Sequence, residues 1–200
     1  MQYQEQKFNL PTLVGISPKQ LEVHLKLYAG YVKNVNVLSA TVDAYKNTED
    51  EGGRYAVSEM KRRLGFEFDG MRMHEYYFTQ WEGGASALSD SGALAQALTT
   101  QYGSIEKFLA EFKAVGMMRG IGWAVLYFDP KAGTFHTAWV GDHEFGQLST
   151  LPIILTMDMW EHAYMVDYVP GDKGQYVEAF FQNLNWNVCE ERFIQIQATK

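Results

Sequence analysis

Two long helical patterns of apolar and polar residues occupy the N-terminal part of the chain. The first spans about 17–46, where Ser17 is a favoured capping residue and Pro18 suits the first helical position. The second spans about 54–81, and the glycines within 65–70 predict a break in it. Two long helices in succession predict an antiparallel helical hairpin.

The second part of the chain changes from helical to strand patterns. Gly83 and Gly84 end the second helical pattern, and the Ser/Gly-rich segment that follows marks a boundary. The order of the expected helices and strands predicts an α+β fold. It has a helical hairpin in 1–84, followed by an α/β domain in 85–200 that contains a three-stranded antiparallel sheet. The expected elements after the boundary are helices at about 89–102 and 104–119, strands at 123–128, 134–140 and 152–157, and terminal helices from Gln175 and Val188.

The segment DMWEHAY, 158–164, carries the strongest chemical signal. It follows a predicted buried strand and sets Asp158 four residues before His162, amid large apolar side chains. A tightly turned or helical backbone brings such a pair to one side, where both groups could bind one metal ion. Taken alone, the same pair could also be a buried aspartate and histidine that only hydrogen-bond each other.

Two further histidines stand in helical, aromatic-rich surroundings. His24 lies in LEVHLKLYAGYV and His74 lies in GMRMHEYYF. Three neutral imidazoles and one carboxylate form a site of low net charge that suits a redox-active first-row metal. Zinc would accept the same ligands.

Composition narrows the functional classes. The 200 residues are 46% hydrophobic, which is enough for a sizeable core, and the net charge of −7 disfavours a nucleic-acid partner. The chain shows no apolar run of membrane-spanning length, and MQYQEQKFNLP lacks the features of a signal peptide. The single cysteine, Cys189, suits a reducing compartment, so we expect a cytoplasmic protein with no membrane partner.

From end to end the chain resembles the iron/manganese superoxide dismutase family. The similar segments are FNLPTL with ISPKQLEVH, MHEYYF, GIGWAVL, DMWEHAY and NLNWNV. The resemblance implies an oxidoreductase that converts two superoxide anions to dioxygen and hydrogen peroxide at one mononuclear iron or manganese ion. It also implies a homodimer, with a tetramer as the other assembly.

The resemblance assigns roles to individual residues. It makes His24, His74, Asp158 and His162 the metal ligands and places Tyr31 at the substrate entrance. It implies that Glu161 bridges to the ligand histidine of the other subunit. The expected aromatic casing consists of Trp123, Trp160, Tyr77 and Trp186.

Metal preference depends on the group that donates a hydrogen bond to metal-bound water. In iron members a glutamine commonly comes from four residues before the second ligand, where this chain has Gly70. In manganese members a glutamine comes from the loop after the second strand, and the matching residue here is His143. A neutral His143 could donate one N–H to the bound solvent. This combination favours iron or the use of both metals.

The entrance departs from the family pattern. Seven positions separate His24 from Tyr31, which keeps both on one face of a regular helix, whereas the family usually has one residue more and a π-bulge. The family's gateway histidine is missing around Leu27 and Tyr28, and Met165 replaces the tyrosine that pairs with it. An acidic protein that binds an anion needs local positive charge at this entrance. The candidates are Arg72, Lys33 and Lys173.

Two other functional classes remain open at this point. A relative that keeps the fold only as a binding module would have no reason to keep all four ligands, Tyr31 and Trp160. A metal-dependent hydrolase or oxygenase needs only two histidines and a carboxylate. A pocket large enough for an organic substrate would favour that second class.

Overall fold

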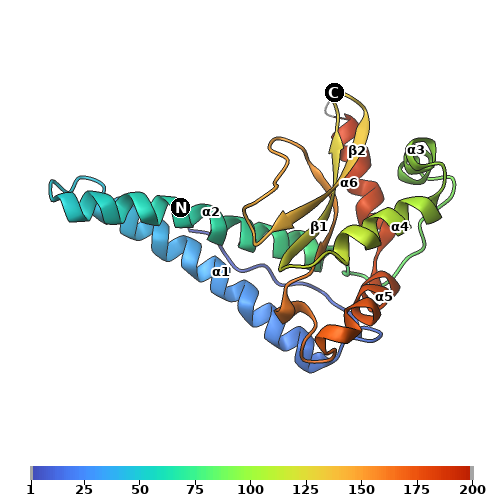
Figure 1. The fold of residues 1–200 in the computed structure, drawn as a ribbon, viewed down its shortest axis with the longest axis horizontal. Coiled ribbons are helices and arrows are strands. Elements are labelled where there is room, and N and C mark those ends of the chain that lie inside the picture. Colours follow the sequence, from blue (N-terminus) through green and yellow to red (C-terminus); the bar gives the residue numbers. More distant parts are fainter. Residues whose placement is uncertain (1, 199–200) are drawn as a thin grey trace.

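A long helical hairpin precedes the sheet, as expected. The computed structural model describes residues 2–198, and its hairpin consists of α1 (Pro18–Tyr45) and α2 (Glu51–Thr79), whose connected ends project away from the rest of the molecule (Figure 1). The Ser17 side chain accepts a hydrogen bond from the Gln20 backbone N–H and so caps α1. α1 is α-helical throughout, which agrees with ordinary winding between His24 and Tyr31.

The predicted break in α2 is wrong. The helix continues through Gly65 and Gly70 and begins at Glu51, earlier than expected, because Asp50 caps it by accepting from the Gly53 backbone N–H. A glycine within a helix costs only about 1 kcal/mol relative to alanine. The buried face of α2, with Met71, His74, Tyr77 and Phe78, outweighs that cost through tertiary packing.

Two shorter helices connect the hairpin to the sheet, α3 (Ala93–Tyr102) and α4 (Ile105–Gly116). α3 begins four residues later than the predicted start at 89, because Ser89 and Gly92 form a turn. The backbone N–H groups of Ala93 and Leu94 donate to the Glu190 carboxylate, which therefore caps this helix from the far end of the chain.

The predicted three-stranded antiparallel sheet is present, in the order β2-β1-β3. Its strands are β1 (Gly122–Asp129), β2 (Thr134–Gly141) and β3 (Ile153–Asp158). β1 is the central strand and is buried along nearly its whole length. The register places Trp123, at its start, opposite Asp158, at the end of β3. The sheet therefore places Asp158 and Trp123 side by side at one end of its strands, where Trp123 contacts His74 of α2.

The remaining elements close the core beside the sheet. Two single-turn 3-10 helices, η1 (Glu161–Ala163) and η2 (Pro170–Asp172), lead into α5 (Lys173–Asn183) and α6 (Trp186–Ala198), each beginning two residues before the predicted start. α5 contributes Phe180, which stacks on Tyr77 of α2 with ring centroids 5.8 Å apart. Within 2–198, no helix combines the length and apolar character needed to cross a membrane.

Candidate metal centre

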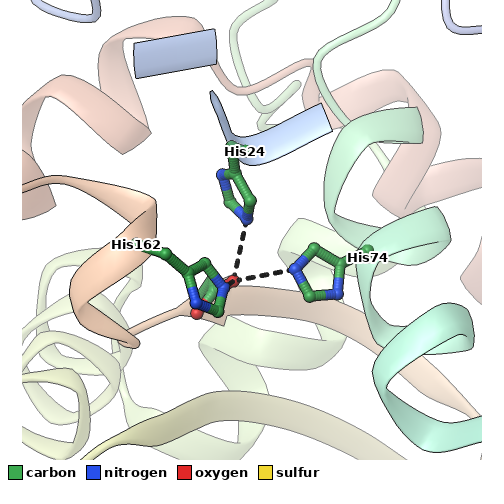
Figure 2. Close-up of side chains that lie close together, drawn as sticks. His24, His74 and His162 are labelled. Atoms are coloured by element: carbon green, nitrogen blue, oxygen red, sulfur yellow. Dashed lines mark hydrogen bonds and ion pairs between the residues drawn. The ribbon is translucent and has the colours of Figure 1, made fainter. Parts of the chain in front are cut away.

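Four side chains from four elements converge at one point between the hairpin and the sheet. His24 comes from α1, His74 from α2, Asp158 from the end of β3 and His162 from η1, and their ligand atoms all lie within 4.8 Å of one another. The Nε2 atoms of His24, His162 and His74 lie 3.0, 3.2 and 3.5 Å from Asp158 Oδ2. Figure 2 shows the three rings directed at this oxygen.

His74 is prepared to bind a cation. Its Nδ1–H donates to the Gly70 carbonyl oxygen at 2.6 Å, which leaves Nε2 as an unprotonated acceptor. This Nε2 is buried and has no hydrogen-bond partner among the described residues. A buried imidazole nitrogen with a free lone pair, directed at a carboxylate and two other imidazoles, fits a metal ligand.

The charge state of the centre suits a divalent or trivalent ion. Burial lowers the pKa of His24 and takes that of His74 well below its ordinary value, so both rings are neutral near pH 7. Burial alone would raise the pKa of Asp158. Its charge and hydrogen-bond interactions with His162, and then with His24, outweigh burial and hold that pKa below its usual range. Asp158 is therefore a carboxylate, and the centre has a net charge that a metal ion balances.

Hydrogen bonds from two neighbours, Trp160 and Tyr176, hold Asp158 in addition to the sheet. Its Oδ1 accepts from the Trp160 backbone N–H at 2.8 Å, and its carbonyl oxygen accepts from the Tyr176 hydroxyl at 2.6 Å. The hydroxyls of Tyr176 and Tyr77 are 3.0 Å apart and share a hydrogen bond. Tyr176 was not among the expected site residues, because a single tyrosine in a terminal helix gives no chemical signal.

His162 is also held in place by a residue that the sequence analysis missed. The Gln20 amide donates from Nε2 to the His162 carbonyl oxygen at 2.6 Å and accepts from the Val166 backbone N–H at 2.9 Å. Gln20 lies one turn before His24 in α1 and is 1% exposed. It therefore ties η1 to the helix that carries the first ligand.

Aromatic rings enclose the ligands. Trp123 meets His74 edge-on with centroids 5.0 Å apart, Tyr77 lies 5.1 Å from His24, and Trp160 stacks on His162 at 5.5 Å. Trp186 does not join this casing: its ring contacts are with Phe108 and Phe181. The expectation for Trp186 is therefore wrong, since the start of α6 faces α4 and α5 rather than the centre.

His143 connects the casing to the entrance. Its Nδ1 accepts from the Trp123 indole N–H at 2.9 Å, so the ring's hydrogen is on Nε2, which lies 2.7 Å from the Tyr31 hydroxyl oxygen. Burial lowers the pKa of His143 to about 4, so the ring is neutral. The Nε2–H therefore donates to the Tyr31 oxygen, whereas we expected it to donate to metal-bound solvent. Tyr31 keeps its own hydroxyl hydrogen for another acceptor.

Gly70 makes room for Tyr31. A Cβ atom at Gly70 would lie 2.7 Å from two carbons of the Tyr31 ring, well inside van der Waals contact. The Tyr31 ring therefore occupies the space beside α2 that a glutamine at this position would need. Burial raises the pKa of Tyr31, which keeps the hydroxyl protonated.

A cleft of about 330 Å³ opens from Tyr31 to the surface. Its charged residues include the cations Lys26 and Arg63, neither of which the sequence analysis proposed. Of the proposed cations, Arg72 pairs with Glu75 and Lys173 donates to the Met118 carbonyl oxygen, and neither lines this cleft. The residues that line the cleft are Lys26, Leu27, Gly30, Tyr31, Asn34, Arg63, Phe66, Glu67 and Trp160.

The residues at the missing gateway have separate environments. Tyr28 is fully buried and donates to the Glu75 carboxylate at 3.1 Å, away from the cleft. Met165 is 44% exposed and Glu161 is also exposed at the surface of the chain. The structure thus brings together the four expected ligands with Tyr31, His143, Trp123, Trp160 and Tyr77, and leaves Glu161 facing outward.

Comparisons with known proteins point to one family. The sequence profile of the family described as iron/manganese superoxide dismutases, C-terminal domain, matches residues 90–192. A superoxide dismutase [Fe] of Saccharolobus solfataricus is 30% identical, covering 96% of each chain. A superoxide dismutase [Fe] of Cupriavidus metallidurans is 34% identical over 90% of each chain. A superoxide dismutase [Mn/Fe] of Aeropyrum pernix is 31% identical over 86% of this chain and 79% of its own.

Proposed function

Because this chain belongs to the iron/manganese superoxide dismutase family, we propose that His24, His74, Asp158 and His162 hold its one iron or manganese ion. The activity is the conversion of two superoxide anions to dioxygen and hydrogen peroxide. The observation that carries the ligand assignment is His74 Nε2, a buried acceptor without a partner in the described chain and within 3.5 Å of Asp158 Oδ2.

The chain's own residues set the conditions for this chemistry. The ion, when bound, supplies a reversible one-electron change. The Asp158 carboxylate would offset part of its charge, and the rings of Trp123 and Tyr77 would limit water around it. The His143 Nε2–H holds the Tyr31 oxygen, so the Tyr31 Oη–H is free to donate a proton toward the departing peroxide.

An organic substrate is disfavoured by the shape of the entrance. The cleft ends at Tyr31 and Trp160, and none of the four ligands belongs to its lining. A hydrolase or oxygenase of the kind left open by the sequence would need its substrate in contact with the ion. A small anion such as superoxide needs only the narrow approach beside Tyr31.

For the metal, we propose iron or the use of both metals. Support comes from Gly70, where the Tyr31 ring leaves no space for a glutamine, and from His143, which takes the position of a hydrogen-bond donor beside the entrance. The relatives named above carry [Fe] and [Mn/Fe] in their names, which is compatible with this proposal.

We also propose that the protein is a homodimer joined through the surface beside the cleft. The exposed Glu161 follows Trp160 of the cleft lining, and exposed apolar side chains are present in the same lining, at Leu27, and just after η1, at Met165 and Val166. Such a patch, with Glu161 in it, suits a symmetric contact that would bring Glu161 to the His162 of a second copy. Two further expectations from the sequence are also proposed here. The chain divides into domains 1–84 and 85–200, and the protein is cytoplasmic.

The decisive experiment is superoxide dismutation by protein reconstituted separately with iron and with manganese, normalised to bound metal. Activity with one or both metals and no activity in the metal-free protein is the expected result. Size-exclusion chromatography with light scattering, on the wild type and on Met165→Glu, tests the dimer. Tight metal binding without dismutation in either form would contradict the proposed function.

A further inference from the structure

Arg63 is held over the cleft by a network that joins the two hairpin helices. Its Nε and Nη2 lie 2.9 and 2.8 Å from Glu67 Oε1, one turn further along α2. The other Glu67 oxygen accepts from the Asn34 side-chain amide of α1 at 3.1 Å. Glu67 is only 4% exposed, so this carboxylate is a fixed anchor rather than a mobile surface group.

The guanidinium has a second fixed contact. Its Cζ lies 3.8 Å from the centroid of the Phe66 ring, which is a close cation-π contact. Phe66 in turn meets His143 edge-on at 4.6 Å and lies 6.2 Å from Tyr31. The Arg63 side chain is nevertheless 50% exposed, so its remaining N–H groups can meet an entering anion.

The charge of Arg63 reaches the inner end of the cleft. Burial raises the pKa of Tyr31, and the positive charge of Arg63 opposes that rise. Burial lowers the pKa of His143, and Arg63 adds to the lowering. At both groups the contribution of Arg63 has the sign of a nearby cation, although at Tyr31 the negative charge of Glu67 raises the pKa by more than Arg63 lowers it.

Arg63 differs from the other cation in the cleft. Lys26 is exposed and makes no ion pair with any described residue, so no carboxylate fixes the position of its ammonium group. Arg63 has a defined position set by Glu67 and Phe66. In a chain with a net charge of −7, a positioned cation is what an anion would need at this opening.

We propose that Arg63, anchored by Glu67 and Asn34 and resting on Phe66, is the residue that collects small monovalent anions at the entrance. The entrance is thereby controlled within one chain by the α1–α2 hairpin, in a protein that lacks the histidine and tyrosine pair around Tyr28 and Met165. This role rests on the proposed function, since superoxide is the anion concerned.

The test compares Arg63→Gln with Arg62→Gln in the metal-reconstituted protein. Arg62 is the neighbouring residue, is exposed, and pairs with Glu59, so both variants remove one positive charge from the same turn of α2. We expect Arg63→Gln to lower kcat/KM about threefold to tenfold at low salt, because a unit charge beside the path attracts the anion. The loss should shrink as salt rises, since the Debye length falls to about 3 Å at 1 M. Arg62→Gln should stay within about twofold of the wild type.

Azide, a monovalent anion, gives a readout that does not depend on turnover. Its dissociation constant, measured from the absorption of the metal-loaded protein, should rise by a similar factor in Arg63→Gln and remain unchanged in Arg62→Gln. Arg63→Lys keeps the charge and should restore at least half of the loss. Equal effects of the two glutamine variants, or no recovery in Arg63→Lys, would overturn the role of Arg63.

The two proposals fail in different ways. If the wild type binds metal and azide but does not dismute superoxide, the proposed function fails, and the azide comparison still decides the role of Arg63. If the wild type is active and Arg63→Gln matches it in kcat/KM, salt dependence and azide affinity, only the role of Arg63 fails. Thermal unfolding of each variant checks that the fold is intact.

Discussion

The inner and outer walls of the metal centre are built on different principles. The inner wall, with His74, Trp123, Tyr77 and Tyr176, is fully buried, and its hydroxyls and indole N–H have defined protein partners. The outer wall, around Tyr31, is half-buried and has charged residues at its rim. The inner wall therefore fixes the proposed ligands. The outer wall governs which anions reach them and supplies the Tyr31 proton.

This difference separates the consequences of substitution. A change on the inner wall removes a ligand or its support and so acts on metal retention. A change on the outer wall leaves the ligands in place and acts on rate, metal preference or the packing of Tyr31. The following substitutions test that separation.

His74→Ala should have the largest effect, because it removes a ligand from the inner wall. Loss of groups that only support ligands costs about 10- to 100-fold in metal affinity, so loss of the ligand itself should exceed about 100-fold. Metal content after dialysis against a chelator measures this. His136→Ala removes an exposed histidine of β2 and is the matched control. Full metal retention in His74→Ala would refute the ligand assignment.

Gly70→Ala tests the packing of the outer wall. The new Cβ would lie 2.7 Å from the Tyr31 ring and displace it, so we expect a loss of about 1–3 kcal/mol in the free energy of unfolding. Gly65→Ala is the control in the same helix, where the nearest atom to a Cβ is 3.8 Å away. It should stabilise the protein by about 0.5–1 kcal/mol through helix propensity. Urea unfolding measures both free energies. Changes of the same sign in the two variants would contradict the contact between Gly70 and Tyr31.

His143→Gln should leave the metal bound and change the activity per metal. The glutamine amide would replace the Nε2–H that donates to Tyr31 and the Nδ1 that accepts from Trp123. We expect the ratio of iron to manganese activity to shift by about tenfold, in the range found for groups beyond the ligands. Unchanged activity per metal with both ions would remove His143 from this role.

Asp69→Asn should give the smallest effect. Burial, and then the negative charge of Glu144, raise the pKa of Asp69 to about 6. Its protonated form is therefore favoured in the folded state, and stability is lost as pH rises from about 4 to about 6. Because the side chain is partly exposed, Asp69→Asn should gain only about 1 kcal/mol at pH 7 and almost nothing at pH 4. Asp90→Asn, at an exposed site, should change stability by less than about 0.5 kcal/mol at pH 7.

The inner wall could be predicted from the sequence far better than the outer wall. His24, His74, Asp158 and His162 stand in segments whose pattern indicates both structure and chemistry, and the structure brings all four together. The three strands of the antiparallel sheet followed from their apolar patterns and the turn residues between them, whereas their order did not. The predicted break in α2 was wrong because tertiary packing outweighs the propensity of Gly65 and Gly70.

The supporting contacts could not be predicted because they depend on side chains distant in sequence. Gln20 reaches His162 and Tyr176 reaches Asp158 only after the elements have packed. Arg63 follows Lys61 and Arg62 in the sequence, and nothing in this local sequence shows that the Glu67 carboxylate holds Arg63 over Phe66. The direction of the His143 N–H, in the turn after β2, likewise depends on Trp123 at the start of β1.

The burial of the centre has a consequence for how the ion is acquired. His24 and Asp158 are 134 positions apart in the chain and both are nearly inaccessible to solvent. The cleft lining contains no proposed ligand, so exchange of a bound ion should require local opening of the structure, which the Gln20 hydrogen bonds to His162 and Val166 oppose. Loading is then a kinetic event tied to folding and to local opening rather than a free equilibrium. The ion in the mature protein would therefore record which metal was abundant while the chain was folding.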